Sequence, residues 1–326
     1  MRNIMFKIDA KDRKILYELD LNARQSTSQI GKKVRLSKNV VGYRIKRMEE
    51  EGIIQNYYTV IDSFRLGYFV LRFYIVYQYI TQDIEQEIIN YFKNSKYTWV
   101  VDSIQGEFDL SVIIWIKNIK DFFNFWSKTL NKFGDYFQNQ TQSFFIQAIS
   151  YRSTYLLGDK KRLNSEKFDI TGFGDFVKIN ELDFRILQLI SSNARMPVTE
   201  IAHRVNSTSA QVHYRLDKLK RLNIIQGFRV NLDIVKLGYK WFKIDIQLKE
   251  YMQRNKIINY IKQNPNLLCI MTSTGLSHLE FEFHLKNTAL VYDTMMDIIN
   301  KFPNAVRNYT YFSVRKAHKL SYMPEE

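Results

Sequence analysis

The chain of 326 residues has little of several residue types that mark specialised classes of protein. Its single cysteine, Cys269, excludes a disulfide within the chain and a zinc site built from several cysteines. Only 4 prolines and 12 glycines are present, so the composition is neither collagen-like nor that of a flexible linker. No apolar run approaches the ~20 residues that span a bilayer, and the charged N-terminal segment does not resemble a signal peptide. We therefore expect a soluble, cytoplasmic protein without a membrane partner.

Basic and apolar residues are abundant instead. Lys and Arg total 48 against 33 Asp and Glu, which gives a formal net charge of +15. Hydrophobic residues make up 45% of the chain, enough for packed cores, and the length favours two or more domains. The positive charge favours a polyanionic partner, with nucleic acid ahead of a membrane surface.

An internal repeat organises the sequence at a constant offset of 171 residues. Residues 22–24 (Asn-Ala-Arg) recur at 193–195, and residues 66–68 (Leu-Gly-Tyr) recur at 237–239. Without a gap, 18 of the 57 positions from Asp12 to Tyr68 are identical in the two copies. We interpret this similarity as a duplication that produced a pair of modules, not a solenoid.

Each copy begins with a helical module. Apolar residues recur at helical spacing in residues 11–21, 27–34 and 38–51. Ser37 stands where an N-cap is expected and Gly52 where the third helix is expected to end. Thr208 is the corresponding cap in the second copy.

Each copy then continues with a strand–helix–strand–strand–helix–strand order, typical of a ferredoxin-like sandwich. In the first copy we predict strands at 68–79, 97–105, 107–116 and 136–151, and helices at 83–94 and 117–133. In the second we predict strands at 239–249, 267–274, 277–285 and 306–315, and helices at 253–263 and 288–301. The fold class is therefore α+β, with two helix-turn-helix modules alternating with two βαββαβ sandwiches.

The domain boundaries follow from this reading. We expect winged helix-turn-helix modules at 1–60 and 176–232, sandwiches at 61–155 and 233–326, and a linker at 156–175. Residues 1–60 hold 13 basic and 7 acidic side chains, whereas residues 61–150 hold 8 and 9. The positive charge of the first half is thus concentrated in its helical module.

Residues 27–51 provide the two helices and tight turn of a helix-turn-helix. Small residues at Gly31 and Ala202 allow a close crossing by the next helix, and Val41, Ile45 and Met48 are expected to face the core. The candidate DNA-binding residues lie on and beside the opposite face: Ser37, Lys38, Asn39, Tyr43, Arg44 and Arg47, then Ser209, Gln211, His213, Arg215 and Lys218. The alternative is a three-helix bundle with a solvated basic face.

These motifs resemble those of the Lrp/AsnC (leucine-responsive, feast-famine) transcription regulators. The matching residues are Asp-x-x-Ile-Leu from Asp12, Asn-Ala-Arg from Asn22, Ser-x-x-x-Val-x-x-Arg-Ile-x-x-Met from Ser37, and Glu-Gly-Ile-Ile from Glu51. Residues 104–118 resemble the Gly-x-x-Asp strand-turn segment of the family's ligand-sensing sandwich. The two copies in one chain depart from the usual single copy.

The resemblance implies a DNA-binding regulator that senses an amino acid or related metabolite, with sandwiches that pair through their sheets. It places candidate effector contacts at Gly106 and Asp109, and at Gly275 and His278 in the second copy, where histidine replaces the aspartate. The alternative for Gly106 and Asp109 is a purely structural turn. We expect no cofactor and, from apolar-looking strands, a homodimer of tandem chains. A pseudo-twofold dimer formed within one chain is the alternative.

Other chemistry has weaker support. His278 and His284 lie six positions apart on a predicted strand, but no third ligand stands at a metal-binding spacing beside them. No phosphate-binding glycine loop or nucleophile-elbow motif is present, so we assign no catalytic residue and no metal ligand. Two alternatives to a regulator stay open: an enzyme like the sirohaem decarboxylases, whose architecture the chain resembles, and a protein-interaction or sensor module that has lost DNA binding.

Overall fold

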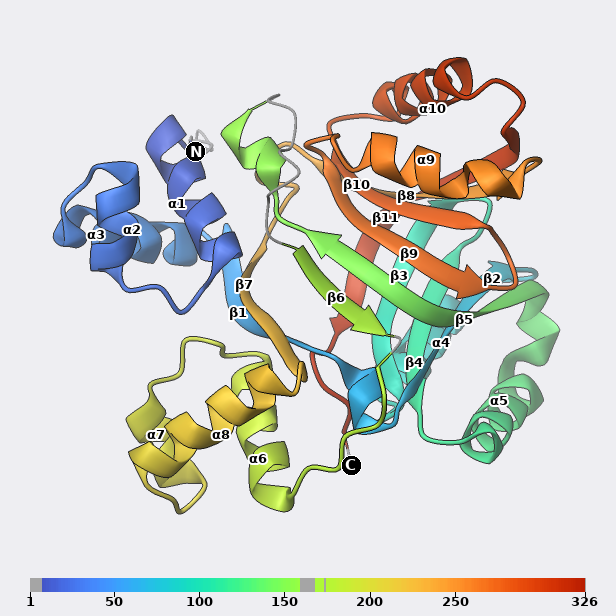
Figure 1. Ribbon diagram of the computed structural model, residues 1–326. Helices are drawn as coiled ribbons and strands as arrows, with labels where there is room; N and C mark the ends of the chain where they lie inside the picture. The colour runs from blue at the N-terminus through green and yellow to red at the C-terminus, as the bar shows by residue number, and fades with distance from the viewer. Residues whose placement is uncertain (1–7, 159–167, 173, 326) are drawn as a thin grey trace.

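The computed structural model of the chain describes residues 8–158, 168–172 and 174–325 (Figure 1). The first unit consists of α1 (Ala10–Leu21), α2 (Thr27–Val34), α3 (Lys38–Glu50), β1 (Ile54–Ile61), η1 (Ser63–Leu66), β2 (Phe69–Tyr77), α4 (Gln82–Lys93), β3 (Thr98–Gly106), β4 (Leu110–Ile116), α5 (Ile119–Phe133), η2 (Gly134–Tyr136) and β5 (Phe137–Tyr151). The second consists of α6 (Glu181–Ser191), α7 (Val198–Arg204), α8 (Ser209–Arg221), β7 (Ile225–Leu232), β8 (Lys240–Leu248), η4 (Tyr251–Gln253), α9 (Arg254–Ile261), β9 (Leu267–Thr274), β10 (Leu279–Leu285), α10 (Ala289–Lys301) and β11 (Val306–Leu320). The predicted α+β class and element order are confirmed.

The strands of each βαββαβ run form a four-stranded antiparallel sheet with helices on one face. The order is β5-β2-β4-β3 in the first unit and β11-β8-β10-β9 in the second. Alternate residues of β2, such as Phe73, pack under α4 and α5, and Phe242 of β8 packs in the same way under α9 and α10. This alternation is what a strand with one helix-covered face requires.

The two sheets join edge to edge within the same chain. β3 pairs with β11, β5 pairs with β9, and the β2–β5 pairing closes eight strands into a ring. β11 extends to Leu320, beyond the predicted end at residue 315, because its second half pairs with β3. Strands apolar on both faces were expected to be covered by another sandwich. In the structure that cover comes from the other copy in the same chain.

The interior of the ring holds buried charges that the sequence pattern did not indicate. Arg72 of β2 bonds to Glu280 of β10 at 2.6 Å, and Lys243 of β8 lies 2.9 Å from the same carboxylate. Lys243 also pairs with Asp245, and all four side chains are at most 3% exposed. Each charge is therefore neutralised by a partner, which buried ions require.

The predicted linker at 156–175 contains ordered structure. Residues 159–167 and 173 lie outside the described residues, but η3 (Thr154–Leu157) overlaps the start of the linker and β6 (Phe168–Gly172) lies within it. β6 pairs with β5, and the buried Asp169 carboxylate binds Arg152 with two hydrogen bonds. The polar, glycine-containing composition suggested a linker because the apolar alternation of Phe168 and Ile170 is too short to indicate a strand, and the strand depends on its pairing with β5.

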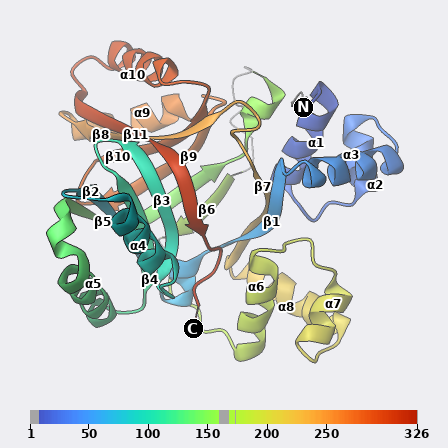
Figure 2. The ribbon, with the colours of Figure 1, turned by 180° about the vertical axis from the view of Figure 1, so that it is seen from behind.

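The wings join the two helical modules. β1 and β7 pair antiparallel as a separate two-stranded sheet, with Thr59 opposite Phe228. Figure 2 shows both helical modules on the same side of the closed strand ring, one beside each end of this wing sheet. Among the described residues, no helix is long and apolar enough to cross a membrane.

Candidate nucleic-acid interface

The third helix of the first module, α3, has one buried and one exposed face. The Ser37 hydroxyl caps it by accepting a hydrogen bond from the Val40 backbone amide at 3.3 Å. Val41, Ile45 and Met48 are buried, as predicted. The side chains of residues 38–40, in the first turn, and that of Tyr43 are exposed to solvent. The exposed side chains that begin this helix are Lys38, Asn39 and Tyr43.

Gly31 and Gly52 have the local roles expected of them. A Cβ on Gly31 would lie 2.6 Å from the Leu36 carbonyl oxygen, so the turn passes very close to α2 at this position. Helix α3 ends at Glu50, and Gly52 follows with a φ of 62°, a left-handed conformation that favours glycine. The tight turn and the end of the reading helix thus depend on local sequence.

Two of the predicted DNA contacts have internal partners. Arg44 donates to Asp12 at 2.8 Å and to Asp9 at 2.7 Å, and Arg47 donates to Asp12 at 3.1 Å. Asp12 is fully buried, so these bonds tie α3 to α1. Hydrogen bonding to Asp9 and Asp12 raises the pKa of Arg44 further. In the structure both arginines therefore position the helix.

The second module repeats this arrangement with different chemistry. Thr208 caps α8, and Val212, Leu216 and Leu219 are buried. Asp183, the counterpart of Asp12, lies 3.5 Å from Arg215 and 3.6 Å from Lys218. The exposed side chains in the first half of α8 include Gln211, His213 and Tyr214, and Ser209 is half-buried at its start. The two modules therefore present different faces on matching scaffolds.

Reciprocal hydrogen bonds fix the two modules relative to each other. Arg24 donates to the Ala194 carbonyl at 2.7 Å, and Arg195 donates to the Ala23 carbonyl at 2.8 Å. The backbone amide of Ala23 bonds to Phe228, and that of Ala194 bonds to Tyr57. Each bond has its counterpart 171 residues away. The two copies are thus related as the subunits of a twofold dimer, in which equivalent surfaces contact each other.

The turns that carry the candidate effector residues Asp109 and His278 make equivalent hydrogen bonds in the two copies. Asp109 is exposed, and its Oδ2 accepts a hydrogen bond from the Tyr77 backbone amide at 2.8 Å. In the second copy, Nδ1 of His278 accepts the equivalent bond from Leu248 at 2.9 Å. The substitution that separates the copies therefore preserves one backbone bond while removing a negative charge.

The glycines of these turns allow the two sheets to approach. Gly106 has a φ of 153°, and a Cβ there would lie 2.6 Å from the Tyr311 carbonyl oxygen. Gly275 has a φ of 121°, and a Cβ there would lie 2.8 Å from the Gln142 carbonyl oxygen. Both glycines stand where the sheet of one copy meets the sheet of the other, a role that the sequence alone did not reveal.

His278 and His284 form separate hydrogen bonds. His284 is hydrogen-bonded to the Tyr155 hydroxyl at 2.8 Å, and burial lowers its pKa to about 3. His278 is held at Leu248, as described. Within residues 8–158, 168–172 and 174–325, no three His, Cys, Asp or Glu side chains are grouped to hold a metal ion.

Comparison with known proteins agrees with this site. A family model described as winged helix-turn-helix DNA-binding matches residues 8–55 and 179–226, the two modules. The HTH-type transcriptional regulator Ptr1 of Methanocaldococcus jannaschii is 33% identical over 113 residues, which cover 35% of this chain and 75% of that protein. LrpB of Bacillus subtilis, another HTH-type regulator, is 42% identical over 62 residues, 19% of this chain and 42% of that protein.

The chain belongs to the Lrp/AsnC family of winged helix-turn-helix regulators. An uncharacterised HTH-type regulator of Pyrococcus horikoshii is 34% identical over 84 residues, 26% of this chain; the chain spans 57% of that relative's length. The crystal structure of the sirohaem decarboxylase NirDL is similar over 96% of this chain and 94% of its own, with a TM-score of 0.64 and 12% identity. At that identity the likeness shows the fold alone.

Proposed function

We propose that this Lrp/AsnC protein is a sequence-specific transcriptional regulator that binds double-stranded DNA with both helix-turn-helix modules of one chain. The observation that carries the proposal is the pair of differing reading helices, α3 and α8, held in fixed relation by the Arg24 and Arg195 bonds. Lysine and amide side chains at the start of such a helix suit contacts to phosphates and base edges. Because α3 and α8 differ, an imperfect palindrome fits better than a perfect one.

The test begins with selection of a binding site from random duplexes, followed by fluorescence anisotropy at several salt concentrations. Lys38→Ala with Asn39→Ala should weaken binding about tenfold or more, and each lost phosphate contact should lower the log–log salt slope by about 0.9. Lys14→Ala, an exposed change on α1, is the matched control. Unchanged affinity and slope in the folded Lys38/Asn39 variant would remove α3 from the interface. Absence of DNA binding by the intact chain would favour the protein-interaction module.

An amino acid or related metabolite is the effector that we propose, with Gly106 and Asp109, and more weakly Gly275 and His278, as candidate contacts. Of the two carboxylate oxygens of Asp109, Oδ2 accepts a hydrogen bond from the described residues and Oδ1 does not. Oδ1 can therefore accept a hydrogen bond from an ammonium group. A thermal-shift screen of amino acids on the wild type and on Asp109→Ala tests this. An amino acid that stabilises both proteins equally does not use Asp109.

The homodimer of tandem chains also stays a proposal. The sheet edges that pair in this fold are already paired within the chain, so a second chain would have to use other surfaces. Light scattering across a dilution series separates a particle of 39.0 kDa from one of twice that mass.

The enzyme alternative draws support only from the fold shared with NirDL. It predicts a change in the absorption spectrum of added sirohaem and decarboxylation lost in His278→Ala. Neither result is expected from a DNA-binding regulator.

A further inference from the structure

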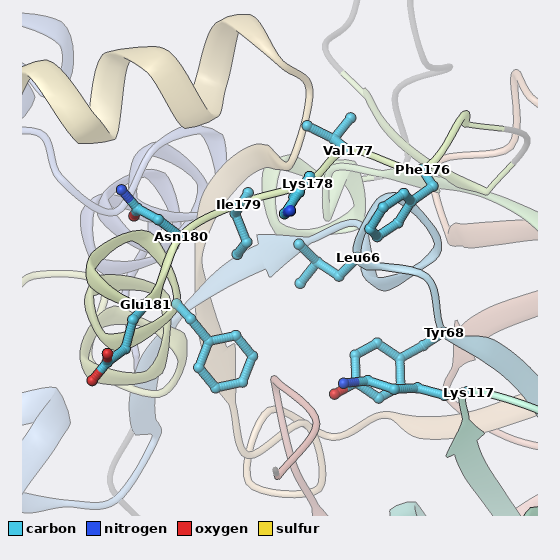
Figure 3. Close-up of a pocket in the computed structure, with 10 residues that line it drawn as sticks. Leu66, Tyr68, Lys117, Phe176, Val177, Lys178, Ile179, Asn180 and Glu181 are labelled. Atoms are coloured by element: carbon cyan, nitrogen blue, oxygen red, sulfur yellow. The ribbon is translucent and has the colours of Figure 1, made fainter.

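A cavity of about 330 Å³ lies between the first sandwich and the second helix-turn-helix module (Figure 3). Its walls include Leu66 and Tyr68 from the first unit, Lys117 after β4, and Phe176 and Val177 from the segment that leads into α6. The volume is at the lower end of the range for small-molecule sites. The cavity therefore has the size of a compact metabolite, and it touches both a sensing and a reading domain.

One wall of the cavity carries the Tyr68 hydroxyl and the Lys117 ammonium. Only 7% of the Tyr68 surface is exposed, and its hydroxyl has no hydrogen-bond partner among the described residues. The Lys117 ammonium lies 5.0 Å from the centre of the Tyr68 ring, and Figure 3 shows the two side chains together at this wall, with Leu66 and Phe176 above them. An unpaired buried hydroxyl is unfavourable, so a ligand that accepts its hydrogen bond is stabilised at this wall.

The second copy differs at the tyrosine that matches Tyr68. Tyr239, the counterpart of Tyr68, packs against the ring of Tyr155 with centroids 4.6 Å apart, and the Tyr155 hydroxyl bonds to His284. Tyr155 stands four residues after the end of β5, and Pro324 stands four residues after the end of β11. Proline provides neither an aromatic ring nor a hydroxyl, so Tyr68 lacks the counterpart of the ring that packs against Tyr239.

Tryptophan replaces the histidine partner in the first copy. Trp115 occupies the β4 position that corresponds to His284 of β10, and its Nε1 has no hydrogen-bond partner among the described residues. It stacks on Trp99 with ring centroids 5.0 Å apart. Trp115 does not line the cavity, but Tyr68, Phe176 and Phe184 do, and this aromatic lining favours a flat apolar body in the cavity.

We infer that this cavity binds a small carboxylate with an aromatic body, whose carboxylate is held by Lys117 and the Tyr68 hydroxyl. The inference names an effector site and rests on the proposed function only for the consequence of binding. Val177 donates to the Arg65 carbonyl at 2.8 Å, so the segment entering α6 is fastened to the rim of the cavity. A bound ligand strengthens that junction and shifts the orientation of the second reading head.

Isothermal titration calorimetry on the full chain tests the site with 3-phenylpropionate, phenylacetate and L-phenylalanine as probes. At least one carboxylate should bind with one site per chain, and its neutral amide should bind at least tenfold more weakly. Lys117→Met should weaken binding about tenfold and Tyr68→Phe about threefold to tenfold, since charge-assisted hydrogen bonds are the stronger ones. Lys286→Met is the matched control. Lys286 is exposed and occupies the position in the second copy that is equivalent to Lys117. It should leave binding unchanged.

The outcomes separate this site from the DNA-binding function. No saturable binding by any of the three carboxylates up to about 10 mM, or binding that Lys117→Met leaves unchanged, overturns the inference. Binding that depends on Lys117 supports it even if the protein does not bind DNA, in which case the proposed function fails alone. Where DNA binding is present, the ligand should change DNA affinity in the wild type and not in Lys117→Met. An equal effect on both proteins would show that the regulatory ligand acts elsewhere.

Discussion

Asp20 of α1 and Arg229 of β7 form a buried bidentate ion pair. Nε of Arg229 donates to Oδ1 of Asp20 at 2.7 Å, and Nη2 donates to Oδ2 at 3.0 Å. The pair connects the first helical module to the wing of the second. Asp20 also accepts a hydrogen bond from the Ser153 backbone amide at 2.7 Å. The duplicated positions are Ser191 and Tyr58, so the pair exists on only one side of the pseudo-twofold axis. The two copies therefore share a scaffold but not all of the contacts that fix it.

Breaking this pair should be costly. Asp20→Asn leaves the Arg229 guanidinium buried without its counter-charge, and we expect the free energy of unfolding to fall by about 3–5 kcal/mol. Chemical denaturation of the variant and the wild type measures the difference. Asp217→Asn, which removes an exposed carboxylate on α8, is the control and should change stability by less than about 0.5 kcal/mol. A loss for Asp20→Asn as small as that of the control would contradict the structure.

The carboxylates beneath the reading helices should affect DNA binding from inside the fold. Asp12→Asn removes the buried charge that Arg44 and Arg47 share and loosens α3 on α1, while Arg44 keeps its bond to Asp9. We expect a stability loss of about 2–4 kcal/mol and weaker DNA binding without a reduced salt slope, since no phosphate contact is removed.

The matched variant is Asp183→Asn, whose partners lie further away at 3.5 and 3.6 Å. Its effects should be smaller in the same assays. A larger loss for Asp183→Asn than for Asp12→Asn would show that these ion pairs do not set the stability of the two modules.

The contribution of two buried carboxyls to stability should fall as the pH rises towards neutrality. Burial raises the pKa of Asp102 on β3 to about 7 and that of Glu282 on β10 to about 7, from ordinary values of 3.8 and 4.5. Between about pH 4.5 and 7 these two carboxyls bind more protons in the folded protein than in the unfolded chain, so their contribution to the free energy of unfolding decreases as the pH rises through this window. His284, whose pKa burial lowers to about 3, acts in the opposite direction below about pH 6.5.

Glu282→Gln removes one of these titrations. Relative to the wild type, this variant should gain about 1–3 kcal/mol at pH 8 and little at pH 5, because the glutamine resembles the protonated acid. Thermal unfolding across that range measures both arms. Arg72, Lys243, Asp245 and Glu280 also face the ring interior and remain in the variant as they are in the wild type. Equal stability differences at the two pH values would exclude Glu282 as a titrating group.

The joint between the sheets should not tolerate a side chain at Gly106. Gly106→Ala combines a φ of 153° with a Cβ only 2.6 Å from the Tyr311 backbone, and we expect a loss of about 2–4 kcal/mol in unfolding free energy. Gly158→Ala is a useful comparison, because Gly158 also has a positive φ, 97°, but a Cβ there meets nothing within 4 Å. If both variants lose the same amount, backbone strain alone explains the effect and the close contact contributes nothing.

The sequence by itself determined the local elements. The 171-residue repeat, the caps at Ser37 and Thr208, and the apolar spacing of Val41, Ile45 and Met48 specified the helices and the family, because these signals depend on neighbours within one or two turns. The change to alternating apolar residues specified both βαββαβ runs for the same reason.

Only the tertiary structure decided how the copies fit together. The closure of the strand ring, the reciprocal Arg24 and Arg195 bonds, and the internal partners of Arg44 and Arg47 join residues far apart in the chain. A sequence pattern records which face of a strand is apolar, but it does not record which sheet covers that face. The buried charges around Arg72 could not be predicted for the same reason. A charged residue in a strand is expected to face solvent until its partner on another strand is known.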